Sequence, residues 1–290
     1  MQPNTLGAVL MVVSMACFTL NDTLMKLTAG AVPLFQLLFL RGVLTCGLIL
    51  ASRGRLGALH FDIAARDWLL IGLRSLAEVL TAYFFLSALF NMPIANVTAI
   101  LQVLPLMVTL ASALFLREVI GWPRMMAIAV GFVGVLMIVK PGTDGFTIWS
   151  VYALVAVLCV TARDLITRAM SPSVPSMTVT LATAFGVMVA FGAASAFQPW
   201  APVTVQSGVL IAGAAVFIMG GYFFSVQVMR VADVGATAPF RYSGLVWALI
   251  VGWIVFGDWP DALTLLGAGI VVATGMFTLY RERRAGGSSR

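Results

Sequence analysis

The stretch CFTLNDTLMKLTAGAVP, residues 17–33, recurs in the second half of the chain as CVTARDLITRAMSPSVP, residues 159–175. The two copies align without a gap at an offset of 142 residues (159 − 17), and they share a cysteine, a threonine, an aspartate, a basic residue and a proline at equivalent positions. Similarity at a fixed offset is the sequence signature of an internal repeat. The chain is therefore predicted to consist of two related halves.

The repeat continues beyond this stretch with small slips in the offset. The triplet 83–85 matches 222–224, since both read Tyr-Phe-Phe, and Thr98 matches Thr237. Further equivalent pairs are Gln102 with Arg241, Glu118 with Asp258, and Gly134 with Gly275. We predict a first repeat over 1–140, a second over 141–284 and a disordered tail over 285–290.

The composition indicates a membrane protein. Of the 290 residues, 61% are hydrophobic and 10% are charged, whereas a soluble domain has about 25% charged residues. Apolar runs of roughly 18 residues or more, enough to cross a ~30 Å hydrocarbon core, follow one another almost without pause. Their continuous apolar character argues against the alternating strands of a β-barrel. Ten spans are predicted, at 6–25, 34–52, 67–90, 93–116, 122–139, 147–168, 176–197, 207–230, 236–256 and 261–280.

Each half contains five spans, an odd number, so the second half must enter the membrane in the opposite orientation. The predicted fold is an all-α integral membrane protein whose ten transmembrane helices form two inverted five-helix repeats. Inverted repeats place a substrate near the bilayer midplane, between the halves. This topology favours a transporter over a receptor or a membrane enzyme.

The net charge of +6 reflects membrane topology rather than nucleic-acid binding. If the N-terminus is cytoplasmic, eleven basic residues lie on the cytoplasmic side, and two, Lys26 and Lys140, lie outside. Because basic residues concentrate in cytoplasmic loops, both termini are expected on the cytoplasmic side of a bacterial inner membrane. The eleven residues are Arg53, Arg55, Arg66, Arg117, Arg124, Arg168, Arg230, Arg281, Arg283, Arg284 and Arg290.

Neither enzyme chemistry nor a cofactor is indicated by the sequence. Cys17, Cys46 and Cys159 fall inside predicted spans and are interpreted as small buried hydrophobes, without disulfide or metal-ligand spacing. The single histidine, His60, lies in a loop, and no phosphate-binding GxxxxGK loop is present. The first apolar run has no basic residue before it and no cleavage site, so we expect a retained helix rather than a signal peptide.

Charged residues at membrane depth are functional candidates because each costs about 2.5–3.5 kcal/mol to insert. Three pairs have i,i+4 spacing, which places both members on one helix face. The structural interpretation is mutual neutralisation, and the functional one is coupling or gating. A proton-coupled carrier could use Glu78 or Asp22, whereas an exchanger needs neither. The pairs are Asp22 with Lys26, Arg74 with Glu78, and Asp164 with Arg168.

Two arginines in the spans have no opposite charge four residues away. Arg241 follows Pro239, which removes a backbone donor and could open the helix. Arg241 could then hold a carboxylate or phosphate in a two-pronged contact; a structural ion pair is the alternative. For Arg41, pairing with Asp22 or with a backbone carbonyl is the favoured interpretation.

Aromatic and amide side chains supply further binding candidates. Tyr83 and Tyr222 could face a cavity and enclose a planar or cationic group, or they could simply pack. Pro105 is expected to bend the fourth span in a way that allows gating. The remaining hydrogen-bonding candidates are Asn21, Gln102, Gln227 and Tyr242.

These features resemble the drug/metabolite transporter superfamily, and in particular its EamA family. The resemblance rests on the ten spans, the two halves and five sequence features: Asn21-Asp22 with Lys26 and Pro33, Arg41, Glu118, Gly131 and Gly134. It implies a basket of ten helices around a central cavity, lined mainly by the first, third, fourth, sixth, eighth and ninth helices. It also implies relatives that export amino acids or carry S-adenosylmethionine.

The sequence thus predicts a secondary transporter of small polar organic metabolites, with amino acids or their derivatives favoured. Carriers of nucleotide-sugars, vitamins or drug-like compounds are alternatives, and a channel or a non-transporting membrane protein is less favoured. The expected partners are the substrate and the lipid bilayer, not nucleic acid, and a homodimer stays open. Within the spans, four basic groups nearly balance three acidic ones, which suits a zwitterion: Arg41, Arg74, Arg163 and Arg241 against Asp22, Glu78 and Asp164.

Overall fold

The computed structural model describes residues 3–52, 60–115, 121–142, 146–171, 173–231 and 237–287. Within these ranges all regular structure is helical. The elements are α1 (Pro3–Leu27), α2 (Leu34–Ala51), α3 (Ala65–Asn91), α4 (Ile94–Leu101), α5 (Leu104–Phe115), α6 (Trp122–Val139), α7 (Ile148–Ala169), α8 (Ser176–Ser195), α9 (Val205–Val231), the 3₁₀ helix η1 (Ala238–Tyr242), α11 (Ser243–Phe256) and α12 (Ala262–Gly287).

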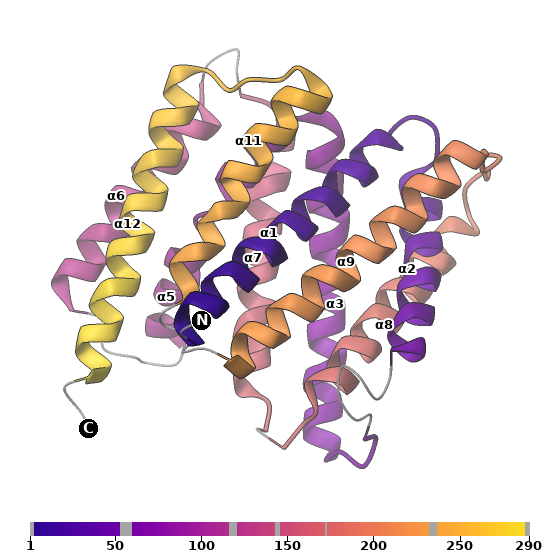
Figure 1. The fold of residues 1–290 in the computed structure, drawn as a ribbon, viewed down its shortest axis with the longest axis horizontal. Coiled ribbons are helices and arrows are strands. Elements are labelled where there is room, and N and C mark those ends of the chain that lie inside the picture. The colour runs from indigo at the N-terminus through magenta and orange to yellow at the C-terminus, as the bar shows by residue number, and fades with distance from the viewer. Residues whose placement is uncertain are drawn as a thin grey trace.

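Ten stretches of the described chain are long and apolar enough to cross a membrane, with α4–α5 and η1–α11 counting as one each. The prediction of ten membrane-spanning helices is confirmed. The helices lie side by side, and both chain termini lie at one end of the bundle, the lower end in Figure 1. We call this the terminal end, and we call the opposite end, which carries the connections 28–33, 92–93, 196–204 and 257–261, the far end.

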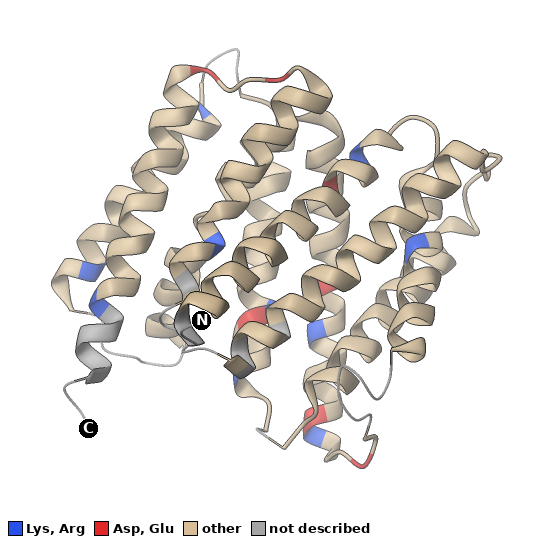
Figure 2. Cartoon of the chain, viewed as in Figure 1, with Lys and Arg blue, Asp and Glu red and all other residues tan. Residues whose placement is uncertain are grey.

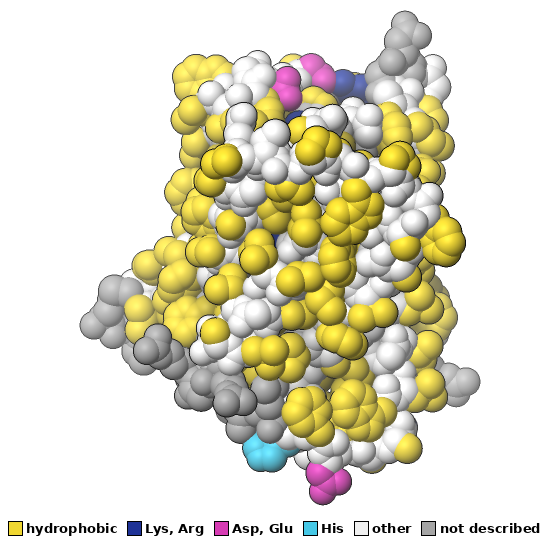
Figure 3. Space-filling view, turned by 90° about the vertical axis from the view of Figure 1, so that its right-hand side faces the viewer, with side chains coloured by type: hydrophobic (Ala, Val, Ile, Leu, Met, Phe, Trp, Pro, Cys, Tyr) yellow, Lys and Arg dark blue, Asp and Glu magenta, His cyan; other side chains and the backbone are white. Residues whose placement is uncertain are grey.

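The surface of the bundle fits a hydrocarbon environment. Figure 3 shows one side of the molecule, where apolar side chains cover most of the height and charged side chains lie toward the two ends. Many large apolar residues on the helices are more than 40% exposed, among them Leu69, Val133 and Ile254. Figure 2 shows that charged residues also occur at mid-height on several helices. That second group provides the candidate site.

The helices pack in pairs that cross between the two halves of the chain. The most extensive contacts are α1 with α9, α3 with α7, α6 with α12 and α2 with α8. If every helix is exchanged for its repeat mate in the other half, the α1–α9 pair becomes the α7–α3 pair. The pairs α6–α12 and α2–α8 each map onto themselves. The packing therefore has the approximate two-fold symmetry of an inverted repeat, and the fourth helices obey it too, since α4 contacts α11.

The fourth helix of each half is irregular at an equivalent position. The first one is interrupted between Leu101 and Leu104, where Gln102 forms the cap of α4. Pro105 has no N–H to donate to the carbonyl of Leu101, so the interruption predicted from this proline is present. In the second half, η1 passes into α11 just after Arg241, the repeat mate of Gln102.

Close approach of α6 and α12 depends on glycine. A Cβ on Gly267 would lie 2.5 Å from the carbonyl oxygen of Gly134, and a Cβ on Gly134 would lie 2.8 Å from the carbonyl oxygen of Gly267. Backbone cannot move aside as a flexible side chain can. Small residues that let helix backbones approach are a general means of packing helices in membranes.

Substituting Gly267 by alanine is therefore expected to lower stability by about 1–3 kcal/mol, the usual cost of overpacking. The matched control is Gly269→Ala on the same helix, where nothing lies within 4 Å of the added methyl group. Thermal unfolding of the purified protein in detergent checks the pair. Equal midpoints for the two variants would contradict this packing.

The C-terminal residues differ from the sequence-based expectation. The helix α12 continues to Gly287, so residues 285–287, expected in a disordered tail, are helical, and 288–290 lie outside the described residues.

At the far end, Lys140 forms an ion pair with Asp261. The hydrogen bond from this ammonium group lowers the pKa of Asp261 to about 2. The contact joins the end of α6 to the start of α12.

Candidate functional site

A pocket of about 430 Å³ opens near the far end of the bundle. Its position follows from its lining, because Pro33 and Leu34 begin α2, Asn91 ends α3, and Trp149 is the second residue of α7. Small-molecule sites usually measure about 300–1,000 Å³. This volume is therefore sufficient for a metabolite.

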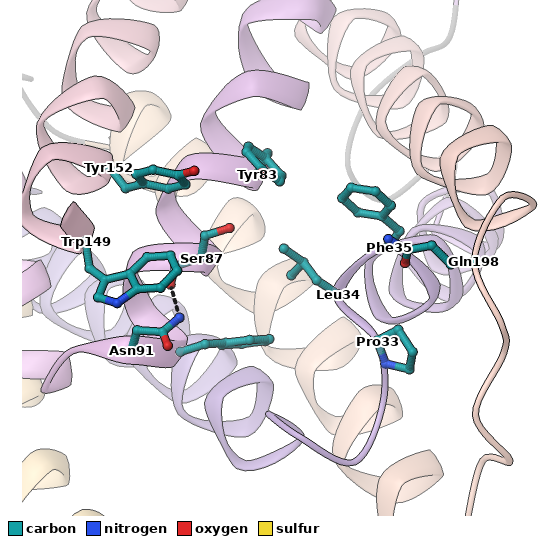
Figure 4. A pocket seen from close by; sticks show the side chains of 10 residues that line it. Pro33, Leu34, Phe35, Tyr83, Ser87, Asn91, Trp149, Tyr152 and Gln198 are labelled. Carbon is teal, nitrogen blue, oxygen red and sulfur yellow. Dashed lines mark hydrogen bonds between the residues drawn. The ribbon is translucent and has the colours of Figure 1, made fainter.

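Aromatic rings form most of the pocket wall. Tyr152 lies centrally, with ring centroids 5.3 Å from Trp149 and 6.1 Å from Tyr83. Phe35, from α2, lies 6.0 Å from Tyr83, and Phe90 adds a further ring. Figure 4 shows Trp149 and Tyr152 on the opposite side of the pocket from Phe35. These spacings fall in the 4.5–7 Å range of favourable aromatic pairs.

The polar groups of the pocket carry no charge. Apart from the hydroxyls of Tyr83 and Tyr152, they belong to Ser87, Asn91 and Gln198. The amide nitrogen of Asn91 donates a hydrogen bond of 2.8 Å to the carbonyl oxygen of Ser87, drawn as the dashed line in Figure 4. The Asn91 amide oxygen and the Gln198 amide thus provide hydrogen-bonding capacity at the pocket entrance.

Charged side chains gather closer to the middle of the helices. Arg163 on α7 is their centre, since its Nη1 donates to Glu78 on α3 at 2.9 Å and its Nη2 donates to Asp164 at 2.9 Å. The side chains of Arg163, Glu78 and Asp164 are 22%, 19% and 34% exposed. All three side chains lie within the membrane-spanning stretches and are only partly covered by protein.

Arg74 does not pair with Glu78 as its i,i+4 spacing predicted. Its Nε donates to the hydroxyl of Thr167 on α7 at 3.0 Å, and its Nη1 donates to the hydroxyl of Thr183 on α8. Glu78 is an electrostatic neighbour of Arg74 but is hydrogen-bonded by Arg163 instead. Within the described chain, none of the three predicted i,i+4 pairs forms an ion pair within 4 Å. Glu78 pairs instead with Arg163 on a facing helix, whereas Asp164 pairs with Arg163, its neighbour on the same helix.

A second polar group lies on α1 and α2. Asn21 donates its amide hydrogen to Asp22 at 2.9 Å, while its amide oxygen accepts from Arg41 at 3.5 Å. Arg41 is thus an electrostatic neighbour of Asp22 without an ion pair to it among the described residues. The predicted pairing of Arg41 with Asp22 is indirect, because Asn21 stands between them.

Lys26 and its repeat mate Arg168 both connect to the end of a fourth helix. Lys26 donates to the carbonyl oxygen of Met92 and lies 5.2 Å from the ring centroid of Phe256, the last residue of α11. Arg168 donates to the hydroxyl of Ser112 on α5 at 2.9 Å. The first contact lies at the far end and the second toward the terminal end. We call them the Lys26 clasp and the Arg168 clasp.

Further hydrogen bonds join the helices at the terminal end. Arg66 donates to the carbonyl oxygen of Ala169 at 3.3 Å, and Asp67 accepts from the backbone N–H of Ser171 at 3.1 Å. The hydroxyl of Thr178 bonds to both backbone groups of His60. Together with Arg74, these contacts tie α3, α7 and α8 at the end opposite the pocket.

The other predicted binding residues lie apart from the pocket. Tyr222 packs edge-on against Phe18 at 5.6 Å and is an electrostatic neighbour of Glu78. Gln102 is buried at the interruption of the fourth helix, and its amide lies near Gly244. Gln227 is half-buried on α9, and Glu118 lies outside the described residues.

Arg241 and Tyr242 are the clearest departures from the predicted site. Arg241 is exposed, rather than held in a cavity, because it falls where η1 ends and α11 begins. Tyr242 is 6% exposed and packs onto Gly275 of α12, and its hydroxyl has no partner among the described residues. Pro239 lies in η1, so the predicted irregularity there is present.

Of the predicted binding residues, Tyr83 lines the pocket. The sequence-based prediction missed Phe35, Trp149 and Tyr152, and it counted Arg163 among the charges without assigning it a role. Trp149 and Tyr152 are three residues apart, a spacing that places two aromatic rings on one helix face, and this signal could have found them.

Comparison with known proteins supports the resemblance. Residues 5–140 match the EamA-like transporter family. The chain is 31% identical over 200 residues to the S-adenosylmethionine uptake transporter of Rickettsia conorii, covering 67% of this chain and 65% of that protein. The first relatives are thus matched over slightly less than two thirds of their own length.

Two other relatives and one solved structure extend the similarity. The chain is 29% identical over 216 residues to the riboflavin transporter of Vibrio cholerae, covering 73% of this chain and 72% of that protein. It is 26% identical over 286 residues to the pseudopaline exporter CntI of Pseudomonas aeruginosa, covering 96% and 97%. A crystal structure with 17% identity superposes with a TM-score of 0.65 over 96% of this chain and 98% of that chain, which indicates the same fold.

Proposed function

Because residues 5–140 of this chain match the EamA-like transporter family, we propose that the protein is a secondary carrier that moves a small organic metabolite across a bacterial inner membrane. Amino-acid derivatives are the favoured substrates. The observation that carries the proposal is the pocket at the far end, which is lined in part by α3 and α7, the two helices that the ion pair of Arg163 with Glu78 joins. The relatives named for S-adenosylmethionine, riboflavin and pseudopaline support a small metabolite in general.

Alternating access follows from the packing symmetry. The pocket lies between α3 and α7 on one side and α2 on the other, while hydrogen bonds close the terminal end between α3, α7 and α8. In the opposite conformation, α1 and α9 adopt the arrangement that α3 and α7 have here, and α3 and α7 adopt that of α1 and α9. The terminal end is then open and the far end is closed. With both termini cytoplasmic, the pocket faces the outside in this structure.

The clasps of Lys26 and Arg168 fit this cycle as a symmetric pair. Each is a basic residue at the end of the first helix of one half, and each binds near a fourth helix, at opposite ends of the bundle. Both contacts are formed in this structure, although the pocket opens at the far end, so the Lys26 clasp does not by itself close that end. Lys26 therefore stays a gating candidate in the proposal, with Arg168 as its repeat mate.

The charges inside the spans favour a substrate of low net charge. Arg41, Arg74 and Arg163 are balanced by Asp22, Glu78 and Asp164, and Arg163 directly holds Glu78 and Asp164. A zwitterion brings an ammonium and a carboxylate to such a group without leaving an excess of either charge. A polyphosphate would leave several negative charges without partners.

The test is transport by purified protein in liposomes. We expect labelled S-adenosylmethionine or a zwitterionic amino acid to enter loaded vesicles and to exchange with unlabelled substrate inside. Uptake should saturate with concentration and should not require ATP. Vesicles without protein provide the background. Absence of uptake or exchange across a panel of amino acids, their nucleoside derivatives and vitamins would sink the proposed function.

A further inference from the structure

One side of the pocket includes a connection between helices. Residues 196–204 join α8 to α9 at the far end, and we call them the strap. Gln198, in the strap, lines the pocket together with Phe35 of α2. Figure 4 shows Gln198 beside Phe35, across the pocket from Trp149 and Tyr152. The strap and the start of α2 therefore form one side of the pocket together.

Gln36 fastens the strap to α2. Its Nε2 donates to the carbonyl oxygen of Ala201 at 2.9 Å, and its Oε1 accepts from the N–H of Ala201 at 2.9 Å. Gln36 is 1% exposed, so water hardly competes for its amide. A glutamine three residues after a helix cap can bond back to the N–H of the capping residue. The cap of α2 is Pro33, which has no N–H, and the Gln36 amide is therefore free to bind the strap.

A second contact holds the strap at the next residue. The ring of Trp200 packs against Phe39 of α2, with centroids 5.9 Å apart, and Phe39 follows Gln36 by three residues on the same helix. The Nε1 of Trp200 also donates to the carbonyl oxygen of Ser195 at the end of α8, at 3.0 Å. The strap is thus tied both to α2 and to α8.

The sequence of the strap transmits this anchoring to Gln198. Ala201 lies three residues after Gln198, with Pro199 between them. Pro199 fixes its own φ and disfavours helical backbone at the residue before it, Gln198. Few conformations then remain to the short segment, so the two bonds at Ala201 also determine where Gln198 lies.

The amide of Gln198 is open to a ligand. Among the described residues its side chain has no hydrogen-bond partner. The other lining residues on this side, Pro33, Leu34 and Phe35, have apolar side chains. Gln198 therefore supplies the polar side chain of this side of the pocket, with its donor and its acceptor both unused.

We propose that the strap is the selectivity element of the far-end pocket, in which Gln198 hydrogen-bonds the bound metabolite and Gln36 is the positioning residue that holds Gln198 in place. The proposal rests on the proposed carrier function and adds the residues that decide what the far end accepts. A primary amide both donates and accepts, so Gln198 selects an uncharged group that does the same, such as an amide or a hydroxyl. The strap also limits the width of the mouth.

The first test measures access to the pocket and needs no substrate. Ser87→Cys in the pocket wall is introduced into protein whose three native cysteines are replaced by alanine. Its reaction rate with iodoacetamide, a small reagent, is compared with its rate with a bulky sulfonated maleimide. We expect Gln36→Leu to speed the bulky reagent at least about threefold, because loss of two hydrogen bonds makes local opening of the strap more frequent. The rate with iodoacetamide should stay nearly unchanged.

The second test measures binding of labelled S-adenosylmethionine and of riboflavin, the compounds for which two relatives are named, to the purified protein in detergent. For a compound that binds, Gln198→Ala and Gln36→Leu should each weaken binding about three- to tenfold, the contribution of one neutral hydrogen bond. The double variant should bind no more weakly than Gln198→Ala alone, because Gln36 acts through Gln198. A merely structural role of Gln36 would make the two losses add.

Thr204→Val is the matched control at the other end of the strap. The hydroxyl of Thr204 bonds to Ser207 at the start of α9 rather than to α2, so the labelling rates and the affinity should equal those of the unsubstituted strap. Trp200→Leu, which removes the ring packed on Phe39, is the second variant if Gln36→Leu does not fold.

Two outcomes would overturn the proposal. One is an equal rate of the bulky reagent in Gln36→Leu and Thr204→Val, and the other is additive loss of affinity in the double variant. If neither compound binds but liposomes transport another metabolite, the half-saturating concentration of that metabolite replaces the binding constant in the same comparison. Absence of all transport would refute the carrier function alone, and the labelling rates would still decide whether Gln36 holds the strap.

Discussion

Replacing Arg163 with methionine is expected to abolish transport and to destabilise the protein by about 1–3 kcal/mol, less than the ~3–5 kcal/mol lost when one partner of a fully buried ion pair is removed, because the paired side chains are partly exposed. Arg163 holds two carboxylates, those of Glu78 and Asp164. Its loss leaves both without their hydrogen-bonded cation in a medium where an uncompensated charge is expensive. The substitution also removes the ion pair between α3 and α7.

The measurement is thermal unfolding together with exchange in liposomes. Arg74→Met is the matched control, because Arg74 is hydrogen-bonded to hydroxyl groups of Thr167 and Thr183 rather than to a carboxylate. It should cost less stability than Arg163→Met. Adding Glu78→Gln and Asp164→Asn to Arg163→Met should restore stability without restoring transport. A wild-type unfolding midpoint for the single Arg163 variant would contradict the central role of this residue.

The number and position of the helices could be predicted from the sequence because they depend on local information. Hydrophobic length fixes where a span begins and ends, and a proline such as Pro105 marks where backbone hydrogen bonding must be interrupted. The resemblance to the drug/metabolite transporter superfamily, predicted from the motifs and the repeat, is supported by the match of residues 5–140 to the EamA-like transporter family. These features require no knowledge of which helix lies beside which.

The partners of the charged residues could not be predicted in the same way. Spacing of i,i+4 shows that Arg74 and Glu78 share a helix face, but it does not show what faces them. The structure places Arg163 opposite Glu78 and two threonines opposite Arg74. A guanidinium bonds wherever an acceptor has the right geometry, and the facing helices provide it.

Equivalent residues of a repeat need not have equivalent roles in one conformation. Tyr83 and Tyr222 match in sequence, yet Tyr83 lines the pocket and Tyr222 packs against Phe18. The pocket opens at the far end, so the two sequence-equivalent positions have different surroundings. Gln102 and Arg241 differ similarly, since the first is buried and the second exposed. Symmetry therefore predicts the fold better than it predicts the site.

The second large effect is expected at Asp22, which differs from the other carboxylates inside the spans. Glu78 and Asp164 are each held by Arg163, whereas Asp22 accepts a hydrogen bond from the neutral amide of Asn21. The nearest charged neighbour of Asp22 is Arg41, which is hydrogen-bonded to Asn21. The adjacent helix α9 places the hydroxyl of Tyr222 near Arg41. A carboxylate that no cation pairs is most cheaply neutralised in an apolar medium by taking up a proton. Asp22, rather than Glu78, is thus the better candidate for proton coupling.

Asp22→Asn should therefore abolish accumulation driven by a pH gradient, of whichever sign drives the wild type, while exchange of labelled for unlabelled substrate continues. An asparagine fills the same space and cannot carry the proton. Glu78→Gln should instead impair accumulation and exchange together, since it weakens the contact of α3 with Arg163. Both variants are compared in liposomes at matched protein content, with and without an imposed gradient. Accumulation above equilibrium by Asp22→Asn would remove Asp22 from coupling, and a wild type that exchanges but never accumulates would remove proton coupling altogether.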